Sequence, residues 1–383
     1  MNWRKLFKVS IAIVSSLVLA STALAGGLPE QWTEVNPADY NYTYQGLEPS
    51  CSCAPGTDGE FTFFVKGGKR NNVVIFFDGG GACWDTTNCL YYSTYTEEQT
   101  EELWQFSEDM AGMGIFDQTK KDNPFRDWGY VFIPYCTGDL HWGAKDTVYP
   151  DYLNQIPYAD SWTIKHRGFV NFQAVLEYLQ NNTNYPGKIF VTGSSAGSYG
   201  ATLAFPYIKE AFQWSNTYLL GDAGNGVLGG TFPTEGILNW NVQMPDWIFP
   251  EGYSPELTIA DIYTAIAAEY PWKRFAQYTT AFDETQIFFF NVMLNINEPW
   301  KWNNISPDVA LTWHVMMRNY AYTTAAASPN YRYYIAEGTD HTVLTLPKFY
   351  DEESAGLSFT EWLKRMLKNP NKWANLECEE CLP

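Results

Sequence analysis

The segment that most constrains the fold runs from Lys188 to Gly200 and reads KIFVTGSSAGSYG. Its first residues form a largely apolar run of the length that a buried strand needs. Gly193 to Gly197 then fit the pattern G-x-S-x-G, and residues that favour a helix follow. A strand, a tight glycine-flanked turn and a helix together form a nucleophile elbow, in which a serine is exposed on a strained turn. The segment therefore predicts Ser195 as a nucleophile, with a simple strand-closing turn as the alternative.

Strands and helices alternate along the rest of the chain. Apolar runs predict buried strands at 73–77, 130–136 and 188–192, and further strands are predicted at 218–220 and 331–336. Apolar residues at helical spacing predict helices at 169–179 and 359–367. Continuous apolar runs are typical of strands buried on both faces of a parallel sheet. The chain is therefore expected to be an α/β protein of α/β-hydrolase type, with a mostly parallel central sheet flanked by helices.

Residues 1–25 have the pattern of a secretory signal peptide. Three basic residues precede an apolar run from Val9 to Leu19, and small residues at 23–25 suit cleavage. The apolar run is too short to span a membrane, so no stable membrane anchor is expected. We expect 26–383 to be a single catalytic domain, secreted or periplasmic. Within it, 85–129 and 230–328 are interpreted as lid-type insertions and 369–383 as a tail.

Export makes the seven cysteines candidates for disulfide bonds, and their odd number leaves at least one without an intrachain partner. Their spacing does not suggest zinc, and neither a metal nor an organic cofactor is predicted. The C-x-x-C pair Cys378 and Cys381 predicts a terminal disulfide or a link to Cys51 or Cys53.

The charge of the chain limits its partners. The net charge is −19 at pH 7, and loss of the basic leader residues takes it to −22. Such a surface repels nucleic acid and anionic membranes, and it also opposes binding of a polyanionic polysaccharide. Aromatic residues make up 17% of the chain and include 16 tryptophans, which permits sugar-stacking or acyl-binding surfaces.

A serine nucleophile needs a base, and the chain has four histidines. His341 follows a strand and a Gly-Thr-Asp loop, and it comes after Ser195, as the α/β-hydrolase order requires. His314 also comes later but lies in an apolar helical run, where a structural role is expected. His141 precedes the nucleophile, and His166 is flanked by two cations. His341 is therefore the predicted base.

The acid that orients the base is open between two aspartates. Asp222 ends the strand after the elbow helix, close to where the sheet places a substrate, and Asp283 precedes an apolar run. Spacing alone does not separate them.

Residues 79–81 are three glycines directly after a buried strand, and such a loop can aim backbone N–H groups at an oxyanion together with Ala196. A phosphate-binding turn is the alternative, but no phosphate-binding motif follows the glycines.

Four motifs together resemble the pectin acetylesterase/Notum family of secreted serine carboxylesterases. They are DGGGACW at 78–84 with a cysteine at 89, IPYCTGD at 133–139, GSSAG at 193–197 and DAG at 222–224. The resemblance extends from about residue 60 to 345. It implies an α/β-hydrolase that removes acyl groups from carbohydrate or protein hydroxyls, with Ser195, Asp283 and His341 as its catalytic triad.

The resemblance also implies a disulfide between Cys83 and Cys89, and oxyanion donors at Gly80, Gly81 and Ala196. Trp84 and Asp222 are expected to contact the substrate.

Two departures from the family pattern bear on the acyl group. Notum-like members carry an aromatic residue where Gly81 stands, and the residues around His341 are only loosely similar. These departures favour a small acyl group. The expected function is hydrolysis of O-acetyl esters on a plant-type polysaccharide such as pectin. The alternatives are a lipid or protein O-deacylase of the Notum type, or a non-catalytic carbohydrate-binding protein.

Overall fold

The computed structural model describes residues 27–99 and 112–381. The predicted signal peptide at 1–25 lies outside these residues. Across the described ranges, none of the helices has the length and apolar character needed to cross a membrane.

The core of the protein is a nine-stranded sheet with the order β1-β2-β4-β3-β7-β8-β9-β10-β13. All neighbours from β4 to β13 are parallel, whereas β1 and β2 form an antiparallel edge. This confirms the predicted mostly parallel sheet. The strands are β1 Thr33–Val35, β2 Phe63–Lys66, β3 Asn72–Phe77, β4 Gly129–Ile133, β7 Lys188–Ser194, β8 Asn216–Asp222, β9 Arg274–Thr280, β10 Tyr331–Ala336 and β13 Leu376–Glu377.

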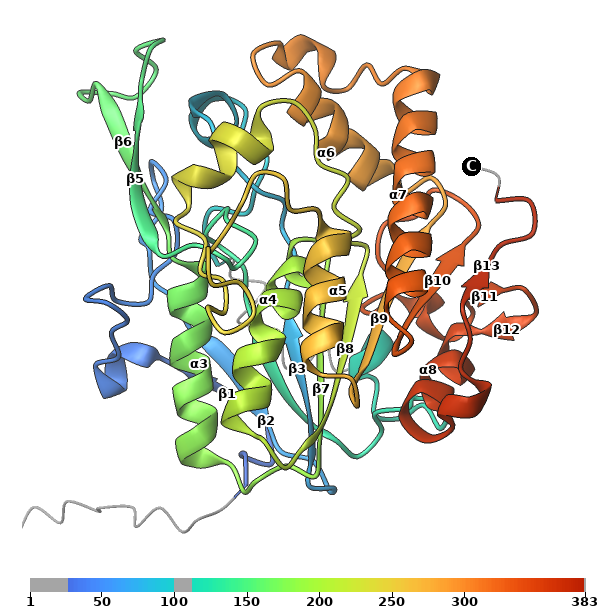
Figure 1. Ribbon diagram of the computed structural model, residues 1–383. Helices are drawn as coiled ribbons and strands as arrows, with labels where there is room; N and C mark the ends of the chain where they lie inside the picture. Colours follow the sequence, from blue (N-terminus) through green and yellow to red (C-terminus); the bar gives the residue numbers. More distant parts are fainter. Residues whose placement is uncertain (1–26, 100–111, 382–383) are drawn as a thin grey trace, which may run out of the picture.

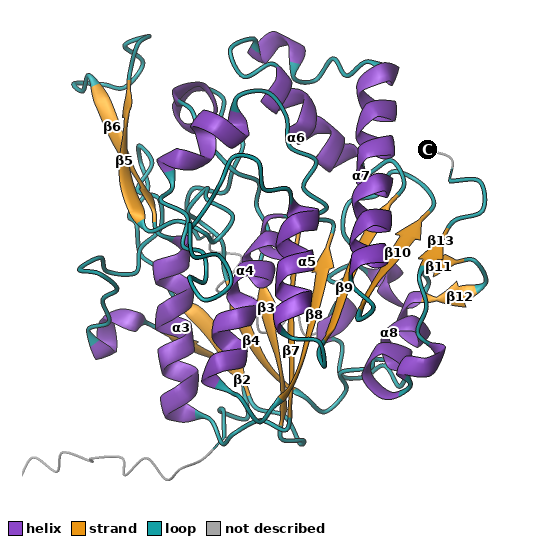
Figure 2. Ribbon diagram, viewed as in Figure 1, coloured by secondary structure: helices purple, strands orange, loops and turns teal. Residues whose placement is uncertain are grey.

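Helices cover both faces of the sheet (Figures 1 and 2). Side chains alternate along β3, so that Val73, Ile75 and Phe77 enter one core while Val74 and Phe76 enter the other. The first core packs against α3 to α7, and the second against α8 and the segment around 115–128. The helices are α3 Gly168–Asn182, α4 Ala196–Ala211, α5 Ile259–Glu269, α6 Glu284–Leu294, α7 Pro307–Ala327 and α8 Phe359–Lys368.

Shorter elements decorate this framework. A hairpin of β5 Lys145–Pro150 and β6 Ser161–His166 projects from the molecule in Figure 1, and β11 Glu353–Ser354 pairs with β12 Leu357–Ser358. Single helical turns lie at Pro37–Tyr40, Thr87–Tyr91, Gly114–Phe116, Phe232–Gly236, Ile237–Asn239, Pro299–Lys301, Pro347–Tyr350 and Pro370–Lys372.

The prediction that 230–328 is an insertion is wrong for its second part. Residues 274–280 form β9, which pairs with β8 and β10 in the middle of the sheet, and α5 to α7 cover that part of it. The sequence does not indicate this strand, because a polar residue, Gln277, lies in the middle of it. Gln277 donates to the carbonyl of Gly224 and accepts from Tyr331, so its polar groups are satisfied inside the protein.

Three disulfide bonds link Cys51 to Cys136, Cys83 to Cys89 and Cys378 to Cys381. The second is the bond implied by the family resemblance, and the third is one of the two pairings predicted for the C-x-x-C segment. Cys53 is the free thiol.

Candidate active site

The five neighbouring strands β3, β7, β8, β9 and β10 are parallel, so their carboxyl ends meet along one edge of the sheet. The glycine loop follows β3, Ser195 follows β7 and Asp222 ends β8. Asp283 and His341 follow β9 and β10. The topology therefore brings together residues that are far apart in the sequence.

Ser195 lies on the turn between β7 and α4, with φ 56° and ψ −123°. This backbone region is sparsely populated for residues with a side chain, and it marks a strained turn. The flanking glycines are required by packing. A Cβ atom on Gly193 would lie 2.3 Å from the carbonyl oxygen of Gly197, and one on Gly197 would lie 2.0 Å from that of Phe77. The turn thus has the predicted elbow geometry.

His341 and Asp283 form a hydrogen-bonded pair. Nδ1 of His341 lies 2.9 Å from each carboxylate oxygen of Asp283, which is completely buried. A carboxylate only accepts, so Nδ1 carries the proton and Nε2 is left as the acceptor. Among the described residues, Nε2 has no hydrogen-bond partner. It is therefore available for a proton from another group in the cavity that His341 and Ser195 both line.

The charge of the imidazole depends on several carboxylates. Burial alone lowers the pKa of His341, but the hydrogen bond and charge of Asp283 raise it. The charges of Asp222 and Glu284 act in the same direction, and the pKa lies above its ordinary value of 6.5.

Gln286 fixes Asp283 and was not singled out from the sequence. Its backbone N–H donates to one carboxylate oxygen and its side-chain amide to the other, both at 2.9 Å. Asp283 is the N-cap of α6 and Gln286 its third residue. The spacing D-x-x-Q, which is that of a helix cap, is the signal that could have identified this support.

Asp222 does not contact the cavity, and the prediction that it binds substrate is wrong. Its side chain is fully buried, and its carboxylate accepts hydrogen bonds from Ser194, Val343 and Leu344. It is also not hydrogen-bonded to His341, so the partner of that histidine is Asp283.

The glycine loop after β3 lies directly against the nucleophile. A Cβ atom on Gly79 would lie 2.9 Å from Cβ of Ser195. The carbonyl of Gly80 accepts from Thr96, at 2.8 Å. Among the described residues, the N–H groups of Gly80 and Gly81 donate no backbone hydrogen bond. Ala196 begins α4, where the first N–H groups of a helix have no partner within it.

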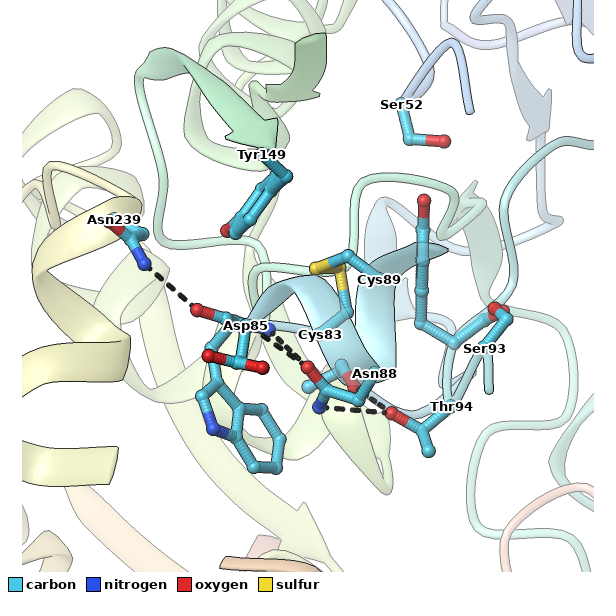
Figure 3. The surroundings of a disulfide bond; sticks show 12 residues. Ser52, Cys83, Asp85, Asn88, Cys89, Ser93, Thr94, Tyr149 and Asn239 are labelled. Carbon is cyan, nitrogen blue, oxygen red and sulfur yellow. Dashed lines mark hydrogen bonds between the residues drawn. A yellow bond between two sulfur atoms is a disulfide. The ribbon is translucent and has the colours of Figure 1, made fainter. Parts of the chain in front are cut away.

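The loop continues into the segment around the Cys83–Cys89 disulfide, which Figure 3 shows. The side-chain oxygen of Asn88 accepts from the N–H groups of Trp84 and Asp85, at 3.1 and 2.9 Å, next to the Cys83–Cys89 disulfide. Asn239 donates to the carbonyl of Trp84 at 2.8 Å. Trp84 lines the cavity, as expected of a residue that borders the substrate.

The cavity has a volume of about 770 Å³, including the part open to solvent. Its wall is mainly apolar, with Trp84, Trp142, Phe232, Ile259, Phe289 and Met293 among its residues. Gln286 and Tyr199 are among its polar wall residues. The side-chain oxygens of both already accept hydrogen bonds, from the backbone N–H groups of Asn225 and Gly226 respectively. Such a wall suits an apolar group better than a free sugar.

Gly81 has no room for a side chain. A Cβ atom there would lie 2.0 Å from the carbonyl oxygen of Thr94 and 3.0 Å from Cζ of Phe289. The aromatic residue that Notum-like members carry at this position therefore cannot be accommodated here. Phe289, from α6, occupies the neighbouring part of the cavity wall instead.

The other three histidines bind the backbone. His141 donates from Nε2 to the carbonyl of Asp78, and burial lowers its pKa to about 4. Burial also lowers the pKa of His166 to about 4, and this residue lies near the Cys83–Cys89 disulfide. Both of its ring nitrogens have hydrogen-bond partners, so it is not a free metal ligand. His314 donates to the carbonyl of Ala281.

The covered parallel sheet and the site at its carboxyl edge define an α/β-hydrolase-like protein. The family model described as pectinacetylesterase matches residues 35–227, which is half of the chain. The chain therefore belongs to the pectinacetylesterase family of hydrolases, which is extracellular. The match includes the glycine loop and Ser195, whereas Asp283 and His341 lie beyond it.

Solved structures support the same fold. The Wnt deacylase Notum from Drosophila, in two crystal forms, gives TM-scores of 0.63 and 0.61 at 15% and 16% sequence identity. Each comparison covers 92% of this chain and 97% of that chain. At these identities the similarity establishes the fold alone. A search of curated proteins finds no match.

Proposed function

We propose that the protein is a serine carboxylesterase in which Ser195 is the nucleophile, His341 the base and Asp283 the residue that orients the base. The observation that carries this proposal is the His341–Asp283 pair, with a free Nε2, beside a serine on a strained elbow turn. Acyl transfer by a serine uses an imidazole that takes the serine proton and a buried carboxylate that orients the imidazole.

The reaction follows from these roles. Nε2 of His341 takes the proton of Ser195 as Oγ attacks the ester carbonyl carbon. The oxygen that becomes negative receives hydrogen bonds from Gly80, Gly81 and Ala196. The C–O bond to the alcohol then breaks, and His341 gives the proton to the leaving oxygen. Water, activated by the same imidazole, hydrolyses the acyl-enzyme and releases the acid.

Two acyl groups are supported by different observations. Family membership favours an O-acetyl ester on a polysaccharide such as pectin. The apolar wall of the cavity favours a longer acyl chain, as in a lipid or protein O-deacylase, and the solved neighbour is titled a Wnt deacylase. A non-catalytic carbohydrate-binding role is less well supported, because binding alone does not need a His341–Asp283 pair near the elbow turn of Ser195.

The decisive experiment compares Ser195→Ala with the wild type on p-nitrophenyl acetate. Loss of a triad nucleophile lowers the rate by up to about 10⁶-fold. The circular dichroism spectrum of the variant should match that of the wild type. The neighbouring Ser194→Ala removes a hydrogen bond and should lose far less activity. Hydrolysis by Ser195→Ala within about tenfold of the wild type would reject the proposal.

The acyl group is determined separately, with p-nitrophenyl esters from acetate to octanoate and an O-acetylated polysaccharide. A maximum of kcat/KM at acetate, with release of acetate from the polymer, supports the polysaccharide esterase. A maximum at the longer chains supports the apolar-acyl esterase.

A further inference from the structure

Asp222 is hydrogen-bonded to the nucleophile elbow and to the segment after His341, but not to the side chain of Ser195 or of His341. Its backbone carbonyl accepts from the N–H of Ser195 at 2.8 Å. Its carboxylate accepts from Oγ of Ser194 at 2.7 Å. Through these two bonds, a residue at the end of β8 holds both the backbone of the elbow and the serine beside the nucleophile.

The same carboxylate holds the segment that follows His341. The N–H of Val343 lies 3.1 and 3.0 Å from its two oxygens, and the N–H of Leu344 lies 2.9 Å from one of them. Val343 and Leu344 are completely buried, so these N–H groups depend on the protein for acceptors.

The backbone is strained at the residue between His341 and the two N–H groups that Asp222 binds. Thr342 has a φ of 64°, in the left-handed region that β-branched residues rarely adopt. Such a conformation persists only when the surrounding structure holds it. The two N–H groups that bind Asp222 follow Thr342 directly, so the carboxylate stabilises the turn on which His341 is carried.

We propose that Asp222 is a positioning residue that ties the turn carrying His341 to the nucleophile elbow and so sets the place of the imidazole relative to Ser195. This inference rests on the proposed esterase mechanism. It assigns to Asp222 a role that differs from both substrate binding and that of the triad acid.

A positioning carboxylate at this place also acts on the imidazole through its charge. The carboxylates that act on His341 are Asp283, Asp222 and Glu284, while the neighbouring Asp340 is paired with Lys348. Burial raises the pKa of Asp222, but its partners all donate hydrogen bonds, which favours the ionised form. Loss of this charge lowers the pKa of His341.

The test is the pH profile of kcat/KM for Asp222→Asn on p-nitrophenyl acetate. The amide keeps the shape of the side chain but removes the charge. We expect kcat/KM on the plateau to fall about tenfold or more, because a small displacement of a catalytic group is costly. We also expect the acid limb to move to lower pH, because His341 is then neutral at lower pH. An acid limb that coincides with that of the wild type overturns the proposal.

Asp139→Asn is the matched control. Asp139 is an equally buried carboxylate that accepts from the backbone N–H groups of His141, Gly143 and Gly168. It is not among the groups that act on His341. Asp139→Asn therefore tests the loss of a buried charge alone. The acid limb of its kcat/KM profile should stay at the wild-type pH. A shift equal to that of Asp222→Asn overturns the proposal.

A measurement without turnover covers the case in which Asp222→Asn is too slow to assay. The imidazole of His341 is titrated by NMR in Ser195→Ala, with and without Asp222→Asn. A lower pKa in the double variant supports the proposal, and an unchanged pKa overturns it. Failure of the esterase proposal is recognised separately, as retained hydrolysis by Ser195→Ala alone.

Discussion

Asp283 is at once the N-cap of α6 and the hydrogen-bond acceptor of His341, with 2.9 Å from Nδ1 to each carboxylate oxygen. The same side chain therefore begins a helix and orients an imidazole. Because Gln286 of the first turn donates to both oxygens, the carboxylate cannot rotate without breaking the cap. The carboxylate that orients the base is thus held by a rigid helix end rather than by a flexible loop.

Asp283→Asn should lower kcat on p-nitrophenyl acetate by about 10⁴-fold, because an amide that donates to Nδ1 favours the wrong tautomer of His341. Steady-state kinetics with a folding check by circular dichroism measure this. Glu284→Gln, the next residue along, is the control, since its exposed carboxylate makes no hydrogen bond to His341. Equal losses in the two variants would contradict the role given to Asp283.

The pH dependence of the wild type should show an acid limb above the ordinary histidine pKa of 6.5. Burial opposes protonation of His341, but the hydrogen bond to Asp283 and the surrounding carboxylates favour it more strongly. The reaction needs the neutral imidazole, so kcat/KM should rise with pH through the raised pKa. The profile is measured on a neutral ester, and an acid limb well below pH 6.5 would contradict the assignment.

The same raised pKa has the opposite effect on stability. A base whose pKa is higher in the folded state stabilises the fold fully below its unfolded pKa, and this contribution is lost as pH rises through the folded pKa. The midpoints of thermal unfolding of the wild type and of His341→Gln should therefore converge as pH rises across this window. A difference between them that grows with pH would show the sign to be wrong.

Phe289→Ala should move the acyl-chain preference toward longer esters, because it removes a ring from the cavity wall beside Gly81. The measurement is kcat/KM along a series of p-nitrophenyl esters. The neighbouring Phe288→Ala is a close control, since that ring is also half-buried but does not line the cavity. Identical chain-length profiles for the two variants would exclude Phe289 as a determinant of acyl length.

Activity on acetylated pectin should rise with added salt more than activity on a neutral ester. The net charge of −19 repels a polyanion at low ionic strength, and the Debye length shrinks to about 10 Å at 0.1 M salt. Rates of acetate release and of p-nitrophenyl acetate hydrolysis are compared at several salt concentrations. The same salt response for both substrates would mean that the net charge does not govern access of the polymer.

The sequence predicts those parts of the fold that have regular local patterns. The strands β3, β7 and β10 contain mainly apolar residues, and their positions follow from that pattern. Strand β9 lacks such a run, because Gln277 is buried but satisfied by partners on other elements. Burial of a polar residue depends on contacts that local pattern does not contain, and the sequence therefore predicts an insertion where this strand lies.

The same distinction applies to the candidate site. Ser195 lies in a contiguous motif, and the order of elements favours His341 over the other histidines. The two aspartates could not be separated by spacing, because the difference between them is which one faces the imidazole. The contacts of Asp222 reach Val343, which is 121 positions along the chain, so its role follows only from the folded arrangement.

The order of the strands in the sheet has a consequence for a chain that is still being made. β10 is the last of the five strands at the site to be synthesised, and it reaches its place beside β9 only through the helices α6 and α7. Until then, Ser195 has neither the imidazole nor the part of the cavity wall that His341 supplies. Under the proposed mechanism a nascent polypeptide is thus inert toward esters. Recovery of hydrolysis during refolding reports the insertion of β10, the last of these five strands.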